Sequence, residues 1–208
     1  MESNIRNNKI RAIIFDLGNV LIKVNFEKML INQVKEKIGS TSQEIMEAAY
    51  KDELFKDFCS GKIDTQAFYR KLIDRLNLSI NYSKFQEKWC DIFEPMDGMD
   101  NLINQLKNDF KIGLLSDTDP LHWRHVLSKF QFLQSIENPT LSYETGCMKP
   151  HPSIYRIATK NVNYPADSCL FIDDRAVNVE GAIKAGMKAI QFKGVNSLKA
   201  QLVDMGLF

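Results

Sequence analysis

The sequence predicts an α/β fold in which a parallel sheet carries helices on both faces and is interrupted by a helical insertion. Short apolar segments recur at residues 11–15, 111–115, 168–172 and 188–192, and segments of helical periodicity separate the last three. This alternation of strands and helices is typical of a parallel sheet. Residues 26–93 have helical periodicity instead, and this segment is far longer than a simple crossover connection of a dozen or so residues. We therefore expect them to form an inserted domain.

Between the later strands, apolar residues spaced three and four apart predict the helices of the core. These helices are expected at residues 98–108, 120–130, 152–163 and 177–186. A weaker strand is expected within "NPTLSYE" (138–144), which brings the sheet to about five strands. Residues 1–25 and 94–208 are therefore predicted to form a doubly wound, Rossmann-like α/β core.

The insertion, residues 26–93, is predicted to be a helical cap of four or five helices over the carboxyl ends of the strands. Helical apolar spacing is found in the segments 26–38, 42–50, 53–59, 64–76 and 82–93. Ser42, Asp64 and Ser83 have the short polar side chains that cap helix N-termini, and they are expected to do so here.

The composition favours a protein with a small-molecule partner. The 208 residues include 27 basic and 26 acidic side chains, so no large net charge attracts nucleic acid or an anionic membrane. No apolar run approaches the roughly 20 residues of a membrane helix, and the first residues lack a signal-peptide core. Four scattered cysteines without a CxxC pair suit free thiols in a reducing compartment. We expect a cytoplasmic monomer or homodimer that binds neither nucleic acid nor membrane.

Polar side chains follow the core strands, at the edge where ligands of open parallel sheets bind. Asp16 follows the first strand, and "SDTD" (116–119) follows the second. Lys149 comes before the third helix, and Asp173 and Asp174 follow the next strand. Mg²⁺ takes one or two carboxylates and leaves other positions to water and substrate phosphate. The sequence thus predicts a Mg²⁺ and phosphate site, in which the lysine offsets the repulsion between carboxylate and phosphate.

Other polar residues in these segments have structural interpretations. Asp119, followed by proline, matches a helix N-cap with proline in the first turn. His122 and His125 lie one helical turn apart, but without a third nitrogen or sulfur ligand they do not predict a transition-metal site. His151, between two prolines, is expected to open a helix, close enough to Lys149 to touch a substrate.

The motifs at the strand ends resemble those of a known superfamily. In chain order they are "IIFDLGNV", "LLSDT", "MKP" and "FIDD", and they are similar to the four motifs of haloacid dehalogenase superfamily hydrolases. The insertion lies where that superfamily has its first cap. The segments "FDLGNV", "GCMKPHPSIY" and "FIDDRAVNVEGA" are further similar to the bacterial α-D-glucose-1-phosphate phosphatase-like group. The resemblance implies a Mg²⁺-dependent phosphatase that hydrolyses a small phosphomonoester, with sugar phosphates as the substrate class, through an aspartyl-phosphate intermediate.

The resemblance also implies the nucleophile and the metal ligands. Asp16 would accept the phosphoryl group and would also ligate Mg²⁺. The backbone carbonyl of Gly18 and the carboxylate of Asp174 would be the other protein ligands.

The remaining matched residues would bind or support the phosphate. The hydroxyl of Ser116 and the amide of Asp117 would hold phosphate oxygens, and Lys149 would neutralise both nucleophile and phosphate. Asp173 would lie outside the metal's own ligands and orient Lys149 or a metal-bound water.

One position departs from the pattern of the superfamily. Most of its phosphatases have a second Asp two residues after the nucleophile, as general acid and then base, and Gly18 stands there in this chain. Such a group typically contributes about 10²- to 10⁴-fold. The sequence leaves open whether water, Asp119 or a cap residue supplies the proton, or whether the leaving group is a good one, such as an anomeric phosphate. Two alternatives therefore stay open: a dehalogenase-type hydrolase, and a non-catalytic binding protein that retains the pocket.

Overall fold

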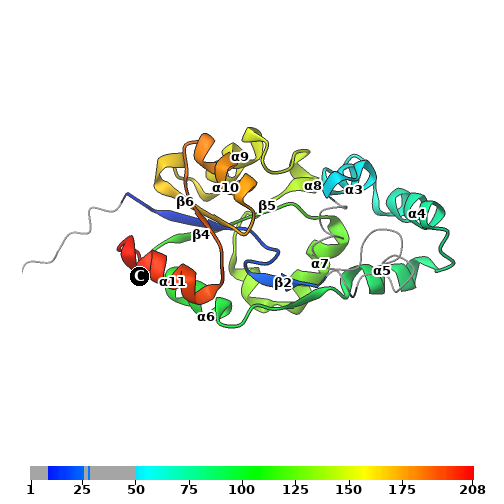
Figure 1. The fold of residues 1–208 in the computed structure, drawn as a ribbon, viewed down its shortest axis with the longest axis horizontal. Helices are drawn as coiled ribbons and strands as arrows, with labels where there is room; N and C mark the ends of the chain where they lie inside the picture. The colour runs from blue at the N-terminus through cyan, green and yellow to red at the C-terminus, as the bar shows by residue number, and fades with distance from the viewer. Residues whose placement is uncertain (1–8, 26–27, 29–49) are drawn as a thin grey trace, which may run out of the picture.

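The computed structural model describes residues 9–25, 28 and 50–208, and its centre is a five-stranded parallel sheet (Figure 1). Its strands, in the spatial order β5-β4-β1-β6-β7, are Thr140–Leu141, Lys111–Ser116, Ala12–Phe15, Cys169–Asp173 and Lys188–Gln191. All four pairings between neighbours are parallel. The predicted fold class and strand number are therefore confirmed, including the weak strand within residues 138–144.

Helices cover both faces of this sheet because alternate strand residues point to opposite sides. Ile14 and Phe171 belong to a buried cluster with residues of α9 and α10, above the sheet in Figure 1. Ile13 and Leu170 belong to a second cluster with α6 and α11, below it. Strands that are apolar on both faces are the reason why the sequence shows continuous rather than alternating apolar segments.

The core helices begin and end close to the predicted positions. They are α6 (Met99–Leu106), α7 (Pro120–Lys129), α8 (Ser142–Thr145), α9 (Pro152–Val162), α10 (Ala176–Lys184) and α11 (Val195–Asp204), with 3-10 turns at Gln131–Ser135 and Ala166–Ser168. The sequence analysis did not predict α8 or α11, although Leu198 and Leu202 of α11 are buried one turn apart. Among the described residues, no helix is both long and apolar enough to cross a membrane.

The insertion lies at one end of the molecule and is joined to the core through a small antiparallel ribbon (Figure 1). The ribbon pairs β2 (Ile22–Val24) with β3 (Phe93–Pro95), and between them the structure describes α3 (Glu53–Cys59), α4 (Thr65–Leu76) and α5 (Tyr82–Cys90). The predicted helices over 26–38 and 42–50, with Ser42 as an N-cap, lie outside the described residues except for Lys28 and Tyr50. The domain limits 26 and 93 stay a prediction.

Two details of the insertion differ from the sequence analysis. The helix expected over residues 82–93 ends at Cys90, and Phe93 belongs to β3. Its N-cap is Asn81 and not Ser83, because the Asn81 side chain accepts the N–H of Lys84 at 2.9 Å. The predicted cap Asp64 is confirmed, since its carboxylate accepts the N–H of Ala67 at 2.7 Å.

The insertion contacts the core closely where α3 ends. The Ser142 hydroxyl donates to the carbonyl of Cys59 at 2.5 Å and accepts the N–H of Thr118 at 2.9 Å. Two residues after Cys59, Gly61 has a φ of +70°, and a Cβ built on it would lie 2.1 Å from the carbonyl oxygen of Tyr143. Glycine is therefore required at this junction by both the backbone conformation and the close approach.

Gly61→Ala should destabilise the fold more than Gly146→Ala does. Both glycines have a left-handed φ, but a Cβ on Gly146 would meet nothing within 4 Å. The Gly146 control should therefore lose only the roughly 1–2 kcal/mol of stability that a left-handed backbone costs a residue with a Cβ. The Gly61 variant should lose about 1–3 kcal/mol more, as overpacking does. Urea unfolding of both variants checks this, and equal losses would show that the junction yields without strain.

Candidate active site

The polar residues predicted from the strand ends meet at the carboxyl edge of the sheet. β1 lies between β4 and β6, so Asp16, Ser116 and Asp173 leave neighbouring strands at one place. The chain passes from β1 to β4 and β5 on one side of β1 and then crosses to β6 and β7 on its other side. This reversal makes β1 a topological switch point. Asp16 and Ser116 are buried, with 8% and 3% of their surface exposed.

Lys149 is the buried cation at the strand ends. Its Nζ donates to Asp16 Oδ1 at 2.6 Å, to Asp173 Oδ2 at 2.7 Å and to the carbonyl of Leu115 at 3.3 Å. The side chain is only 2% exposed. Its own backbone N–H donates to Asp117 Oδ1 at 3.0 Å, which fixes the loop before α9. The lysine thus ties β1 and β6 together at the point where both end.

Asp173 is fully buried and has hydrogen bonds at both of its oxygens. Oδ1 accepts the backbone N–H of Arg175 at 2.8 Å and Asn178 Nδ2 at 3.0 Å. Oδ2 accepts Lys149 Nζ, and Asn178 Nδ2 lies 3.1 Å from it. Its oxygens are therefore occupied by protein donors, which suits a residue that orients Lys149. The sequence analysis missed Asn178, which lies in the first turn of α10 and five residues after Asp173.

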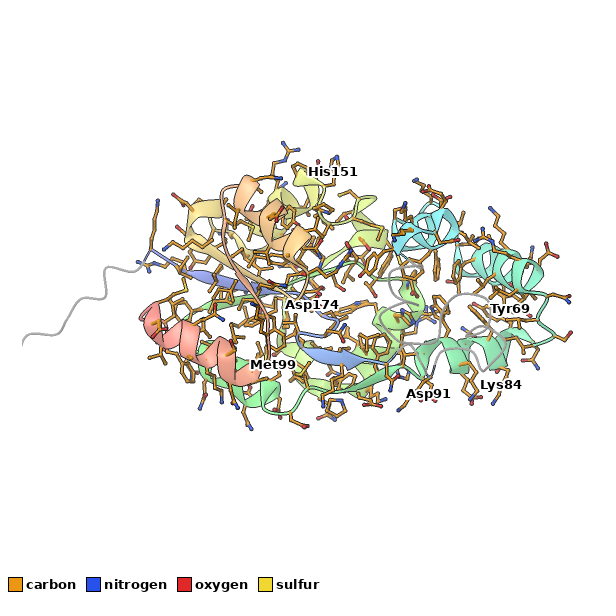
Figure 2. The ribbon with its side chains drawn as sticks, viewed as in Figure 1. Tyr69, Lys84, Asp91, Met99, His151 and Asp174 are labelled. Carbon is orange, nitrogen blue, oxygen red and sulfur yellow. The ribbon has the colours of Figure 1, made fainter. Side chains whose placement is uncertain are left out.

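Three carboxylates gather around this single lysine. One oxygen each from Asp16, Asp173 and Asp174 lies within 4.8 Å of the others, and Asp174 is near the centre of the molecule in Figure 2. Burial raises the pKa of Asp16 well above its usual value; Lys149 lowers this pKa, and the charges of Asp173 and Asp174 raise it further. Burial and the charge of Asp173 likewise raise the pKa of Asp174. Such a cluster has an excess of negative charge, and its oxygen ligands fit a hard divalent cation.

A pocket opens beside this cluster and extends to the insertion. It is lined by Asp16, Leu17, Gly18, Asn19, Val24, Tyr50, Phe55, Cys59, Ile92, Phe93, Ser116, Asp117, Thr118, His122, Asp174 and Arg175. The Arg175 guanidinium lies 3.9 Å from the centre of the Tyr50 ring, so a core residue and a residue of the insertion meet at its wall. Sequence reasoning missed both, although Arg175 follows directly after a predicted metal ligand.

Gly18 is in the pocket wall and does not have a left-handed backbone. A Cβ on it would lie 3.1 Å from Val24 Cγ2, a contact that a small shift of this side chain relieves. The left-handed residue of the turn is Asn19, with φ +57°, and its Oδ1 accepts the N–H of Val24 at 3.1 Å. Backbone freedom is therefore not the reason why glycine occurs at position 18.

Asp119 and His151 cap the helices that the sequence predicts them to cap. Asp119 caps α7, because its Oδ1 accepts the N–H groups of Leu121 and His122 at 2.9 and 3.0 Å. Its Oδ2 accepts Trp89 Nε1 at 3.1 Å and lies 2.8 Å from His122 Nδ1, while His122 Nε2 lies 2.8 Å from the Trp89 carbonyl. The fully buried Asp119 is thus fully engaged and is no proton donor for a substrate. His151 caps α9 and is exposed, away from Asp174 in Figure 2.

Comparison with known proteins identifies the family. The model of haloacid dehalogenase-like hydrolases matches residues 10–186. The chain belongs to this family. It is 25% identical to a chloroplast flavin mononucleotide hydrolase of Arabidopsis thaliana, over 97% of this chain and 80% of that protein. It is 24% identical to the D-ribitol-5-phosphate phosphatase of Bacteroides thetaiotaomicron, over 88% of this chain and 91% of that protein.

Solved structures of the family have the same fold. A haloacid dehalogenase family enzyme from Bacteroides thetaiotaomicron, in complex with magnesium and inorganic phosphate, superposes with a TM-score of 0.75 at 24% identity. The match covers 89% of this chain and 95% of that chain. The predicted resemblance to haloacid dehalogenase hydrolases is therefore confirmed.

Lys149→Met should destabilise this hydrolase by about 3–5 kcal/mol in metal-free buffer at neutral pH. The substitution leaves two buried carboxylates without their cation, and breaking a buried pair in this way costs about that much. The loss should shrink as the pH falls, because Asp16, with its raised pKa, then takes up a proton and the uncompensated charge disappears. Unfolding in urea at several pH values measures it. Lys184→Met, at an exposed position, is the control, and similar losses in both variants would contradict the prediction.

Proposed function

We propose that the protein is a Mg²⁺-dependent phosphatase that hydrolyses a small phosphomonoester, a sugar phosphate by class, through an aspartyl-phosphate intermediate. The observation that carries the proposal is the placement of Asp16. This carboxylate ends the central strand at a switch point, lies 2.6 Å from Lys149 Nζ and opens on a pocket that also holds Asp174. A buried carboxylate beside a fixed cation is arranged to meet an anionic group and attack it.

The residues of the core divide the first chemical step among themselves. Asp16 attacks phosphorus and displaces the substrate oxygen, so that a carboxylate–phosphorus bond forms as the ester bond breaks. Lys149, held by Asp173, reduces the repulsion between the nucleophile and the phosphate, which at ~4 Å amounts to roughly 4 kcal/mol per pair of unit charges at an effective dielectric near 20. The Ser116 hydroxyl and the Asp117 amide bind phosphate oxygens. Water then attacks phosphorus and releases Asp16.

Asp16, Asp174 and the carbonyl of Gly18 would hold the Mg²⁺ ion. Bound there, the ion would neutralise charge on the phosphate and orient it for in-line attack. Asp173 is assigned to Lys149 rather than to the ion, since its oxygens already accept hydrogen bonds from protein donors.

The substrate class rests on the similar proteins and on the pocket. Flavin mononucleotide and ribitol 5-phosphate, from the names of two relatives, are both phosphate esters of primary alcohols. The pocket adds apolar walls from Phe55 and Ile92 to polar groups from Tyr50 and Arg175. This mixture suits a leaving group that carries hydroxyls on a carbon frame. We keep the predictions of a cytoplasmic location and of a monomer or homodimer.

A phosphatase panel with and without Mg²⁺ separates the proposal from its alternatives. Hydrolysis of phosphate esters that requires Mg²⁺ supports the proposal. Release of halide from a 2-haloacid without metal would indicate the dehalogenase-type reaction. Binding of phosphate esters without turnover would indicate a non-catalytic protein. The cluster of Asp16, Asp173 and Asp174 favours the metal-dependent phosphatase over the dehalogenase.

Asp16→Asn should lower turnover by roughly 10⁴-fold or more, as loss of other covalent nucleophiles does. The amide is nearly isosteric with the carboxylate, so folding should be preserved while nucleophilic attack fails. Steady-state hydrolysis and thermal unfolding measure the two effects. Asp167→Asn, at an exposed site on the opposite end of the sheet, is the control. Retained turnover in the Asp16 variant would show that another group attacks.

Asp174→Asn should weaken Mg²⁺ binding by at least about 10-fold. Substitution of residues that only hydrogen-bond to metal ligands can already cause a loss of this size. Removing one carboxylate takes away a charged ligand and leaves Asp16 as the principal anionic one. Calorimetric titration with Mg²⁺ in the absence of substrate measures this apart from turnover. Asp204→Asn, exposed at the end of α11, is the control, and unchanged affinity in the Asp174 variant would place the ion elsewhere.

A further inference from the structure

One residue of the pocket wall has a buried carboxyl oxygen without a partner. Within the described residues, Oδ2 of Asp117 is shielded from water and has no hydrogen bond. Buried polar atoms nearly always have partners, so each exception needs an explanation, and a catalytic role is one of them. Asp117 lines the same pocket as Asp16 and Asp174.

Asp117 and Gly18, where the missing acid would be, line one pocket and follow the ends of neighbouring strands. β1 and β4 are neighbours with Phe15 opposite Leu114, so Gly18 and Asp117 each lie three residues beyond a paired position of neighbouring strands. Gly18 and Asp117 both lie in the pocket wall. The other carboxyl considered for the task, Asp119, uses both oxygens for hydrogen bonds inside the protein.

The structural role of Asp117 does not explain why the residue is an acid. Its Oδ1 accepts the backbone N–H of Lys149, and an asparagine carbonyl would accept it equally well. An ionised carboxylate here would add a fourth negative charge beside Asp16, Asp173 and Asp174 and would repel the phosphate. A protonated carboxyl has neither disadvantage and has a proton to give.

We propose that Asp117 is the general acid that replaces the carboxyl missing at Gly18, an inference that rests on the phosphatase function proposed above. As Asp16 forms its bond to phosphorus, the electrons of the breaking phosphorus–oxygen bond move to the leaving oxygen. The Oδ2 proton of Asp117 passes to that oxygen, and the alcohol departs. The Asp117 carboxylate then accepts a proton from the water that attacks the aspartyl-phosphate, which restores the acid.

The surrounding charges permit this protonation. Burial raises the pKa of Asp117 to about 6; Lys149 and Arg175 lower it, and Asp173 raises it. Tyr50 is the neighbour from the insertion, since its own pKa is raised by burial and then by the charge of Asp117. A bound phosphate adds negative charge and raises the pKa of Asp117 further. A general acid is most effective when its pKa is near the working pH.

The experiment compares two substrates in the first chemical step. Primary alkyl phosphates need a proton on the leaving oxygen, whereas a nitrophenyl phosphate hardly does. Rapid-quench single-turnover measurements with Mg²⁺ isolate leaving-group release from the later hydrolysis. Asp117→Asn should slow alkyl release by about 10²- to 10⁴-fold. It should slow aryl release much less, because the Lys149 contact is preserved. In the unmodified enzyme, alkyl release relative to aryl release should fall as the pH rises above about 6, through the pKa of Asp117 in the complex, and the variant should lose this dependence.

Other outcomes overturn the inference in distinguishable ways. Equal slowing of both substrates would show that Asp117 only positions Lys149, and no slowing would show that another donor acts. Should the variant fail to fold, the unmodified enzyme still decides: a steep dependence of its rate on leaving-group pKa, in a series of alkyl and aryl esters, means that no acid acts. If the unmodified enzyme cleaves neither ester, the proposed function itself has failed.

Discussion

One buried ammonium group determines the geometry of the carboxyl edge of the sheet. Lys149 Nζ lies 2.6 and 2.7 Å from carboxylates that end the neighbouring strands β1 and β6. Without a cation between them, these two buried charges would repel one another and each would lose its hydration. The lysine lies in the loop before α9. Asp117, the residue after β4, fixes this loop because its side chain accepts the backbone N–H of Lys149. Three strand ends and one loop are therefore held in register by a single residue, through its side chain and its backbone N–H.

The insertion is attached to this edge through a second buried polar group. His122 of α7 stacks on Trp89 of α5 with ring centres 5.1 Å apart, and each of its nitrogens faces an oxygen acceptor. The neighbour of Nδ1 is the Asp119 carboxylate, and the neighbour of Nε2 is the Trp89 carbonyl. The same carboxylate caps α7 and accepts the Trp89 indole N–H. The helix α5 of the insertion is thus fixed to the first turn of α7, which follows "SDTD" and carries His122 into the pocket wall.

The sequence predicts the parts of the structure that depend on local pattern. Apolar strands and a polar residue after each of them locate Asp16, Ser116 and Asp173, because parallel strands place their carboxyl ends together. Contacts between distant segments do not follow from such patterns. Asn178 meets Asp173 only because α10 turns back over β6, and Tyr50 meets Arg175 only because the insertion folds over the sheet. Ser83 failed as a cap prediction because Asn81, equally suitable, lies where the helix starts.

The lining of the pocket separates the chemistry from the recognition of the leaving group. Among the described residues that line it, all the acidic and basic side chains come from the core, namely Asp16, Asp117, His122, Asp174 and Arg175. The insertion, residues 26–93, contributes Tyr50, Phe55, Cys59, Ile92 and Phe93. Burial raises the pKa of Tyr50 and of Cys59, which keeps both neutral. Because the pocket residues of the insertion carry no charge, they do not compete with the core for the cation or for the phosphate. Changes in their shapes would therefore alter which alcohol fits while the charges that act on phosphorus stay in place.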